Sequence, residues 1–435
     1  MPVPRTYHLV TLGCPKNDVD SEHLERLLAG GELIPVLQPE GADAVIVNTC
    51  GFIEQSQAES FAAIRELAGR KQDGQTLIVA GCLSQLYAGQ VRETAPGVDH
   101  VFGVGQWQEV ARLLSVDVDA VYDIPESAAR VSGPSAYLKI SDGCDAPCAF
   151  CVIPRIKGRL RSAPAGLVVR EAKRLVAAGA KELVLVGQDT TAWGEDQGSP
   201  VGEGLPLLLK QLAGAVGPET WLRLMYAYPS RVSPQLIETM ATTPNIVPYL
   251  DVPLQHGSDA VLRRMKRPHN LEKVRAFIHD LRTAMPDIVL RTSFIAGFPG
   301  ETEAEFRELL DFAREIRFDH AGCFTYSRQQ WTPAFEMPGQ VSAAVMGRRR
   351  DRFMRQQQAI AGKLARRFVG RTLPLLVEGC GEDGDGLPVV VGRTYREAPE
   401  VDGLVLARGA AEPGSIASVR ITASSEYDLF GTVVG

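Results

Sequence analysis

The chain has 435 residues, 45% hydrophobic and 23% charged, with a formal net charge of −6 at pH 7. This length predicts two or three globular domains, and the charge balance does not by itself indicate a nucleic-acid binder. No stretch approaches the ~20 apolar residues that span a bilayer, and residues 1–6 begin no secretory signal. The eight cysteines therefore indicate metal or redox chemistry rather than disulfides, and we expect a cytoplasmic protein.

Residues 1–120, the first expected domain, alternate strand and helix patterns. Strands are expected at 7–12, 44–47, 76–80 and 100–103. Helices are expected at 18–29, 53–68 and 84–93, and a last helix follows the fourth strand and ends near residue 114. Such alternation predicts an α/β domain with an open parallel sheet covered by helices on both faces.

Three cysteines of this domain, Cys14, Cys50 and Cys82, each follow one of its first three strands and lie beside a glycine. Open α/β sheets bind ligands at the carboxyl ends of their strands, and helix N-termini favour thiolates. We therefore predict that these residues, the N-terminal triplet, converge to hold a cluster. The alternative is that they are buried small apolar residues. Lys16 is either a solvated turn residue or a positive group near the cluster.

Residues 121–135 are rich in Ser, Pro and Gly and are expected to form a linker, after which the alternation resumes over residues 136–345. Strands are expected at 137–140, 182–186, 221–227, 249–252, 289–295 and 321–326, and helices at 165–178, 205–213, 234–241, 258–283 and 303–315. Six strands are too few for a full eight-stranded barrel, so a partial (β/α)6 barrel fits best. Chemistry in such barrels gathers at the carboxyl ends of the strands.

Cys144, Cys148 and Cys151, the barrel triplet, follow the first of these six strands in a C-x3-C-x2-C order. Cys thiolates are the standard ligands of a [4Fe–4S] cluster, and three of them leave the fourth iron open to another ligand. A zinc site would normally need a fourth Cys or His nearby, and none follows within ten residues. A fortuitous group of structural thiols is the remaining alternative.

The spacing of the barrel triplet, with Phe150 just before the last cysteine, resembles the radical S-adenosylmethionine (radical SAM) enzymes. This resemblance implies that SAM binds the open iron and that Phe150 lies near its adenine. Gln188 and Asp189, after the second strand, resemble the place where the family holds the methionine amino group. Gln255 follows the fourth strand and Gly297 the fifth, where the family often lines the adenine. Plain turn, cap or core roles are the alternatives at these strand ends.

A basic helical linker is expected over residues 346–370, because nine Arg or Lys lie between residues 348 and 371 against a single acid, Asp351. A solvated helix face is its simplest interpretation. Residues 371–435 then form the last expected domain, with short strands at 373–378, 387–391, 404–407, 415–422 and 429–433. This texture predicts a small antiparallel OB-like or TRAM-like barrel.

The whole chain resembles the methylthiotransferases, radical SAM enzymes with an N-terminal three-Cys domain, a partial barrel and a C-terminal TRAM domain. Six of the eight cysteines match the family's ligand positions, and Cys323 and Cys380 are left as ordinary thiols. Residues 11–22 (TLGCPKNDVDSE), 48–54 (NTCGFIE) and 253–258 (PLQHGS) look like the RimO-type branch. That branch adds a methylthio group to the β-carbon of an aspartate in small-subunit ribosomal protein twelve.

The resemblance implies two [4Fe–4S] clusters, SAM as both radical source and methyl donor, and an electron donor such as a flavodoxin. It assigns no catalytic side chain beyond the cluster ligands. The expected partner is ribosomal protein twelve, free or on the ribosome, with no membrane and no direct nucleic-acid substrate. Residues 371–435 carry five Arg and ten Asp or Glu, a net charge of −5, which suits a basic protein better than RNA, unless this domain docks on the basic helix instead. Action on a transfer RNA adenosine is the main alternative, and a non-enzymatic cluster carrier is a second.

Overall fold

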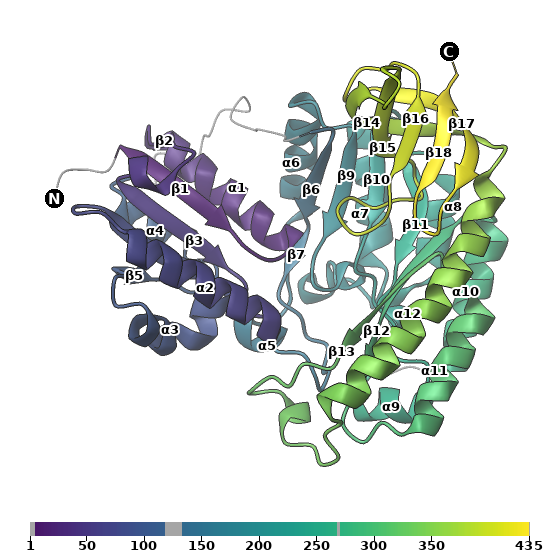
Figure 1. Ribbon diagram of the computed structural model, residues 1–435, viewed down its shortest axis with the longest axis horizontal. Helices are drawn as coiled ribbons and strands as arrows, with labels where there is room; N and C mark the ends of the chain where they lie inside the picture. The colour runs from purple at the N-terminus through teal and green to yellow at the C-terminus, as the bar shows by residue number, and fades with distance from the viewer. Residues whose placement is uncertain (1–4, 118–132, 268–269, 435) are drawn as a thin grey trace.

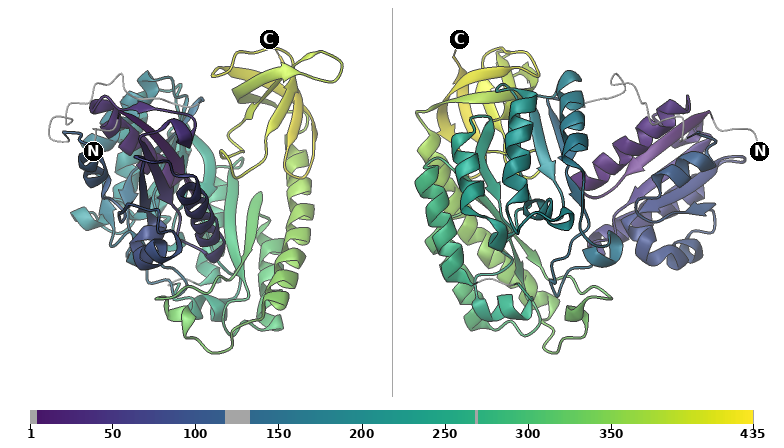
Figure 2. Two further views of the ribbon diagram at one scale, coloured as in Figure 1. Left: turned by 60° about the vertical axis from the view of Figure 1, so that its left-hand side comes forward. Right: turned by 180° about the vertical axis from the view of Figure 1, so that it is seen from behind.

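The computed structural model describes residues 5–117, 133–267 and 270–434. Figures 1 and 2 show an N-terminal α/β part beside one edge of a central barrel, and a small C-terminal barrel near one end of it. Most of the expected linker, residues 121–132, lies outside the described residues. Within the described ranges, no helix combines the length and the apolar character that a membrane crossing requires.

The N-terminal part contains the predicted open parallel sheet, with strand order β2-β1-β3-β4-β5. Its strands are β1 (Thr6–Thr11), β2 (Ile34–Pro35), β3 (Ala44–Thr49), β4 (Thr76–Gly81) and β5 (His100–Val101). Its helices are α1 (Pro15–Gly30), α2 (Glu54–Arg70), α3 (Cys82–Thr94) and α4 (Trp107–Leu113). The strand β2 was not predicted from the sequence, because two residues are too few to show an alternating pattern.

The central part is a six-stranded parallel sheet with order β13-β12-β11-β10-β9-β6, as expected for a partial barrel. Its strands are β6 (Ser135–Lys139), β9 (Glu182–Val186), β10 (Trp221–Leu224), β11 (Ile246–Asp251), β12 (Val289–Ala296) and β13 (His320–Thr325). Its helices are α6 (Ala165–Ala177), α7 (Gly204–Val216), α8 (Pro234–Thr242), α9 (Asp259–Arg264), α10 (Leu271–Ala284) and α11 (Glu303–Ile316).

The single helix expected over residues 258–283 is wrong, because the chain forms two helices, α9 and α10, in its place. Lys266 has a left-handed φ of 56°, which a continuing helix does not allow. The sequence then has Pro268, which disfavours helical geometry at the preceding residue. Asn270 restarts the chain as a helix by accepting a hydrogen bond from the Lys273 N–H at 2.9 Å.

The basic run forms α12 (Ala343–Ala365), which packs along the central barrel through buried Phe353. Its arginines pair with acids at the start of α11: Arg349 binds Glu301 at 2.8 Å, and Arg352 binds Glu303 at 2.8 Å. The expectation of a mainly solvated face therefore fails for Arg349, which is buried. Among the described residues, no ion pair joins α12 to an acid of the C-terminal barrel.

The C-terminal part is the predicted small β-barrel, closed in the order β14-β15-β16-β18-β17. Its strands are β14 (Thr372–Glu382), β15 (Pro388–Arg393), β16 (Val405–Arg408), β17 (Ile416–Ser424) and β18 (Leu429–Val433). Four of the neighbouring pairs are antiparallel, but β16 and β18 are parallel. The expectation of a wholly antiparallel barrel is therefore wrong at this pair, whose long connection through β17 lets both strands run the same way.

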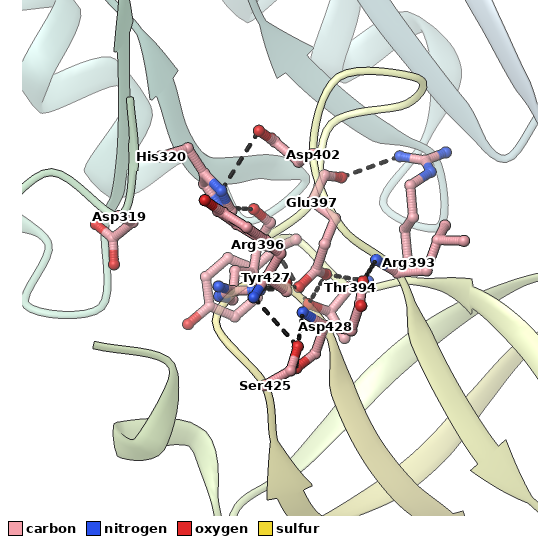
Figure 3. A network of polar contacts seen from close by, with 12 residues as sticks. Asp319, His320, Arg393, Thr394, Arg396, Glu397, Asp402, Ser425, Tyr427 and Asp428 are labelled. Atoms are coloured by element: carbon pink, nitrogen blue, oxygen red, sulfur yellow. Dashed lines mark hydrogen bonds and ion pairs between the residues drawn. The ribbon is translucent and has the colours of Figure 1, made fainter. Parts of the chain in front are cut away.

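The loop between β15 and β16 enters the amino-terminal end of the central barrel, and Figure 3 shows part of its polar network. Arg393 binds Glu182, the first residue of β9, at 2.8 Å, and both side chains are at most 1% exposed. The Tyr249 hydroxyl donates to Asp402 Oδ2 at 2.6 Å. A ring nitrogen of His320, the first residue of β13, lies 3.1 Å from the carbonyl oxygen of Arg396. The loop thus fills the end of the barrel opposite the cysteines.

Candidate active site

The N-terminal triplet meets at one edge of the first sheet, as the sequence predicts. Cys14 precedes α1 as its N-cap, Cys50 directly follows β3, and Cys82 is the first residue of α3. The strands before them, β1, β3 and β4, are neighbours in the sheet. Gly13 permits the close approach, because its φ is +110° and a Cβ there would lie 2.6 Å from Cys50 Cβ.

Asn17 ties the three strand ends together beside these thiols. Its amide NH2 donates to the carbonyls of Leu12 at 2.7 Å and Thr49 at 3.2 Å, and its Oδ1 lies 3.7 Å from Cys82 Sγ. Asn is a common helix-capping residue, but Asn17 does not cap α1, which has no side-chain cap. A buried asparagine after the first cysteine could have been recognised only from its tertiary contacts.

The barrel triplet lies on a loop closed by a short antiparallel ribbon, β7 (Ser141–Asp142) with β8 (Arg161–Ser162). The Cys144 N–H donates to the Gly158 carbonyl at 3.2 Å, which narrows the neck of the loop. Gly143 has a φ of +72°, and a Cβ there would lie 2.0 Å from the Arg159 carbonyl oxygen, so no other residue fits this turn. The helix α5 (Ile153–Ile156) follows the last cysteine.

Burial affects the acidity of three of the six thiols. Burial raises the pKa of Cys82 to about 12, that of Cys144 to about 11 and that of Cys151 to about 12. Metal ions reverse this preference, since a coordinating thiol is deprotonated outright. In residues 5–117, 133–267 and 270–434, no three His, Cys, Asp or Glu side chains gather closely enough for one metal ion. Three thiolates and no fourth protein ligand are the donor set that leaves one iron of a [4Fe–4S] cluster open, whereas a structural zinc site normally takes four protein ligands.

The two triplets share a wall. Cys82 packs in one apolar cluster with Val152, the residue after Cys151, and with Ile156 of α5. Beside them, Lys157 donates to Asp20 of α1 at 2.7 Å. Figure 1 accordingly shows α5 at the junction between the N-terminal sheet and the barrel.

A network of charged side chains surrounds the barrel triplet at the carboxyl ends of β9 and β10. The Arg267 guanidinium donates to Cys148 Sγ at 3.5 Å and lies 4.0 Å from the centroid of the Tyr228 ring. Arg231 donates to Asp189 Oδ2 at 3.2 Å and also binds Glu195 at 2.7 Å. Tyr228, Arg231 and Arg267 were not predicted from the sequence. The first two follow the third barrel strand, one of the two strand ends for which no site residue was predicted, whereas nothing local marks Arg267.

Asp189 and Gln188 follow β9, at the carboxyl edge where the sequence analysis expects them. Burial raises the pKa of Asp189, against the opposing effects of the Thr191 hydroxyl and Arg231. Gln188 Oε1 is buried and, among the described residues, accepts no hydrogen bond. A buried acceptor without a partner is costly, so this atom fits a donor on a bound ligand, such as an amino group.

The other three expected cofactor contacts lie elsewhere around the barrel. Phe150 packs against the main core, and Gln255 has a left-handed φ of 76° and is bridged by backbone hydrogen bonds to β12. Gly297 faces α12, since a Cβ there would lie 2.1 Å from Met346 Cγ. Within the described part of the chain, none of the three has a hydrogen bond with Asp189. Their cofactor contacts stay predictions.

Comparisons with known proteins agree with this architecture. Family models match residues 6–103 (Uncharacterized protein family UPF0004), 138–313 (Radical SAM superfamily) and 369–434 (TRAM domain). Proteins named ribosomal protein uS12 methylthiotransferase RimO match nearly end to end. The protein from Roseiflexus sp. is 45% identical, with 98% of this chain and 97% of the relative covered. The protein from Geobacter sulfurreducens is 42% identical, with 98% of each covered.

The chain belongs to this RimO methylthiotransferase family. It is an enzyme, and its cofactors are two [4Fe–4S] clusters and SAM. Among solved structures, the radical SAM methyltransferase TsrM from Kitasatospora setae has a TM-score of 0.58 at 16% identity and covers 76% of this chain and 74% of its own. The cobalamin-dependent SAM radical enzyme OxsB has a TM-score of 0.52 at 14% identity, covering 82% and 56%. These two likenesses concern the fold alone.

Proposed function

We propose that this enzyme adds a methylthio group to the β-carbon of an aspartate in ribosomal protein uS12, the small-subunit protein twelve expected from the sequence. The observation that carries the proposal is the shared wall between the two triplets, where Cys82 packs against Val152. Two cofactor sites so close together suit a reaction in which one site activates a carbon and the other delivers sulfur to it. No side-chain acid or base can deprotonate an unactivated carbon at neutral pH, so cofactors must carry the step.

We assign one cluster to the N-terminal triplet and the other to the barrel triplet. When bound, the clusters and SAM supply the radical that removes hydrogen from the β-carbon, the sulfur that replaces it and the methyl group. The chain's own residues bind and orient: Gln188 Oε1 offers an acceptor to the SAM amino group, and Arg267 donates to Cys148 Sγ. Phe150, Gln255 and Gly297 are retained as proposed neighbours of the SAM nucleoside.

A protein substrate also suits the charge of the C-terminal barrel. Of its five arginines, Arg393 and Arg396 are buried, Arg371 pairs with Asp287 at 2.7 Å, and Arg408 pairs with an acid of its own barrel at 3.1 Å. Among the described arginines of this domain, Arg420 is therefore the one that is neither buried nor paired with an acid. RNA-binding surfaces are basic, whereas this one offers acids to a basic protein.

We further propose that the enzyme works in the cytoplasm, where ribosomes are assembled, and draws electrons from a donor such as a flavodoxin. Both proposals follow from the substrate and the radical chemistry. A transfer RNA adenosine is the competing substrate, but no feature of the site favours it.

The test is a mass measurement. Anaerobically reconstituted enzyme is given SAM, a reductant and a sulfur source, with either uS12 or bulk transfer RNA as substrate. We expect uS12 to gain the mass of one methylthio group in place of hydrogen on a single aspartate, and the RNA to stay unmodified. Methylthiolation of the RNA alone would overturn the proposal. Enzyme in which the barrel triplet is replaced by alanine is the control.

A further inference from the structure

Lys16 reaches from the N-terminal domain into the mouth of the barrel. It is the second residue of α1, two positions after Cys14. Its Nζ lies 3.6 Å from the centroid of the ring of Tyr226, which follows the carboxyl end of β10. The ammonium group therefore lies between the two domains, on the side of the sheet where the N-terminal triplet gathers.

This ammonium is a charge without an anionic partner. Among the described residues, Lys16 makes no hydrogen bond or ion pair, and the Tyr226 ring is its one charge-stabilising contact. The other lysines at the junction differ, because Lys139 and Lys157 both bind Asp20. A ring face attracts a cation but accepts none of its N–H groups in the way an oxygen does, so the three donors of Lys16 remain free for a ligand.

The ring beneath Lys16 is held in place at a conformational cost. Tyr226 has a left-handed φ of 58°, which is rare for a bulky residue. Its N–H donates to Asp251 Oδ2 at 3.2 Å, and its carbonyl accepts from the Thr190 N–H at 3.2 Å. Asp251 is fully buried and is itself bound by Arg291 at 2.9 Å. A strained residue fixed from several sides is typical of a functional position.

We propose that Lys16 binds the carboxylate of the substrate aspartate and thereby fixes its β-carbon between the two cofactor sites. This inference rests on the proposed function and adds to it the side chain that recognises the carboxylate of the substrate. A lysine ammonium is a compact point charge that matches a single carboxylate, and a carboxylate is what distinguishes aspartate from asparagine.

The test compares two substrates on three enzymes. Fluorescent uS12 peptides carrying either the target aspartate or asparagine in its place are titrated against wild-type holoenzyme, Lys16→Met and Lys16→Arg. Met keeps the unbranched length and removes the charge. We expect the wild type to bind the aspartate peptide about tenfold or more tightly than the asparagine peptide. Lys16→Met should bind both alike, and Lys16→Arg should restore part of the preference.

Two controls separate this inference from the proposed function. Lys210→Met removes an exposed lysine of α7 and should behave as the wild type. Iron content checks that each variant carries both clusters. If the wild type fails to discriminate between the peptides, or if Lys16→Met still prefers aspartate, the role of Lys16 is refuted while modification of uS12 stands. If intact uS12 is not modified by the wild type at all, the proposed function fails, and this inference with it.

Discussion

Asp20 holds the N-terminal domain against the barrel, and replacing it by Asn should loosen that docking. Its carboxylate on α1 accepts hydrogen bonds from Lys139 of β6 and from Lys157, the latter at 2.7 Å. The side chains of Asp20 and Lys157 are only 6% and 3% exposed, and that of Lys139 is 21% exposed. Asn keeps the shape but removes the charge that both lysines share.

Removing one member of a buried ion pair typically costs about 3–5 kcal/mol. Two features reduce the cost here, because Lys139 can turn to water and Lys157 keeps Asp142 at 3.6 Å. We therefore expect about 2–3 kcal/mol. Hydrogen exchange of the peptides from α1 and β6 in the holoenzyme should then be about 30- to 150-fold faster, at about 1.4 kcal/mol per tenfold change.

The same interaction predicts a pH dependence. Burial acts to raise the pKa of Asp20, but the charges and hydrogen bonds of Lys139 and Lys157 outweigh it and leave the pKa lowered. A carboxyl whose pKa is lowered by folding stabilises the fold fully above its unfolded value of about 3.9. That stabilisation is lost as the pH falls through the folded value. The difference between wild type and Asp20→Asn should be constant from neutral pH down to about 5 and shrink below about 4.

The matched control is Glu66→Gln, which breaks an exposed helix pair with Arg70 in the same domain. Exposed pairs of this kind contribute about 0.3–0.5 kcal/mol, so exchange in this variant should stay within about threefold of the wild type. The reasoning about Asp20 is refuted if exchange in Asp20→Asn is as slow as in Glu66→Gln.

Three further predictions concern the cofactor sites and the C-terminal barrel. Alanine in place of the N-terminal triplet should lower the iron content from about eight to about four per chain while reductive cleavage of SAM continues, and loss of cleavage in this variant would contradict the assignment. Arg393→Met leaves Glu182 with one fewer partner and should lower the free energy of unfolding by about 3–5 kcal/mol in a thermal unfolding experiment. Arg408→Met changes a side chain that is 62% exposed and should lower it by under about 1 kcal/mol. Equal losses of stability in the two variants would contradict the prediction that the buried pair contributes more than the exposed one. Arg267→Met removes a positively charged hydrogen-bond donor from Cys148 Sγ and should therefore lower the reduction potential of the barrel cluster. A redox titration followed by electron paramagnetic resonance measures this potential. An unchanged potential would show that Arg267 does not act on the cluster.

The sequence was sufficient for features that depend on local patterns. Strand, turn and helix alternate regularly around Cys14, Cys50 and Cys82, so their meeting at one sheet edge follows from the geometry of parallel strands. The six barrel strands and the five C-terminal strands were predictable for the same reason. The helix break before α10 could also have been read from Pro268, which the expected long helix ignored.

Features that depend on distant contacts were not predictable. Arg267 meets Cys148 across 119 residues, and Arg393 meets Glu182 across 211. No local pattern encodes such pairings. Asn17 illustrates the same limit, since a capping residue and a buried tie between strands look alike in the sequence.

The loop that fills the amino end of the central barrel has a consequence for the order of events in turnover. Because the loop that carries Arg393 and Asp402 fills that end, we expect a nucleoside to approach the barrel triplet from the opposite mouth, where we also expect the protein substrate to bind. A protein substrate bound at that mouth would block the entry of SAM. We therefore expect an ordered cycle in which SAM enters before uS12 and the spent nucleoside departs after the modified protein has left.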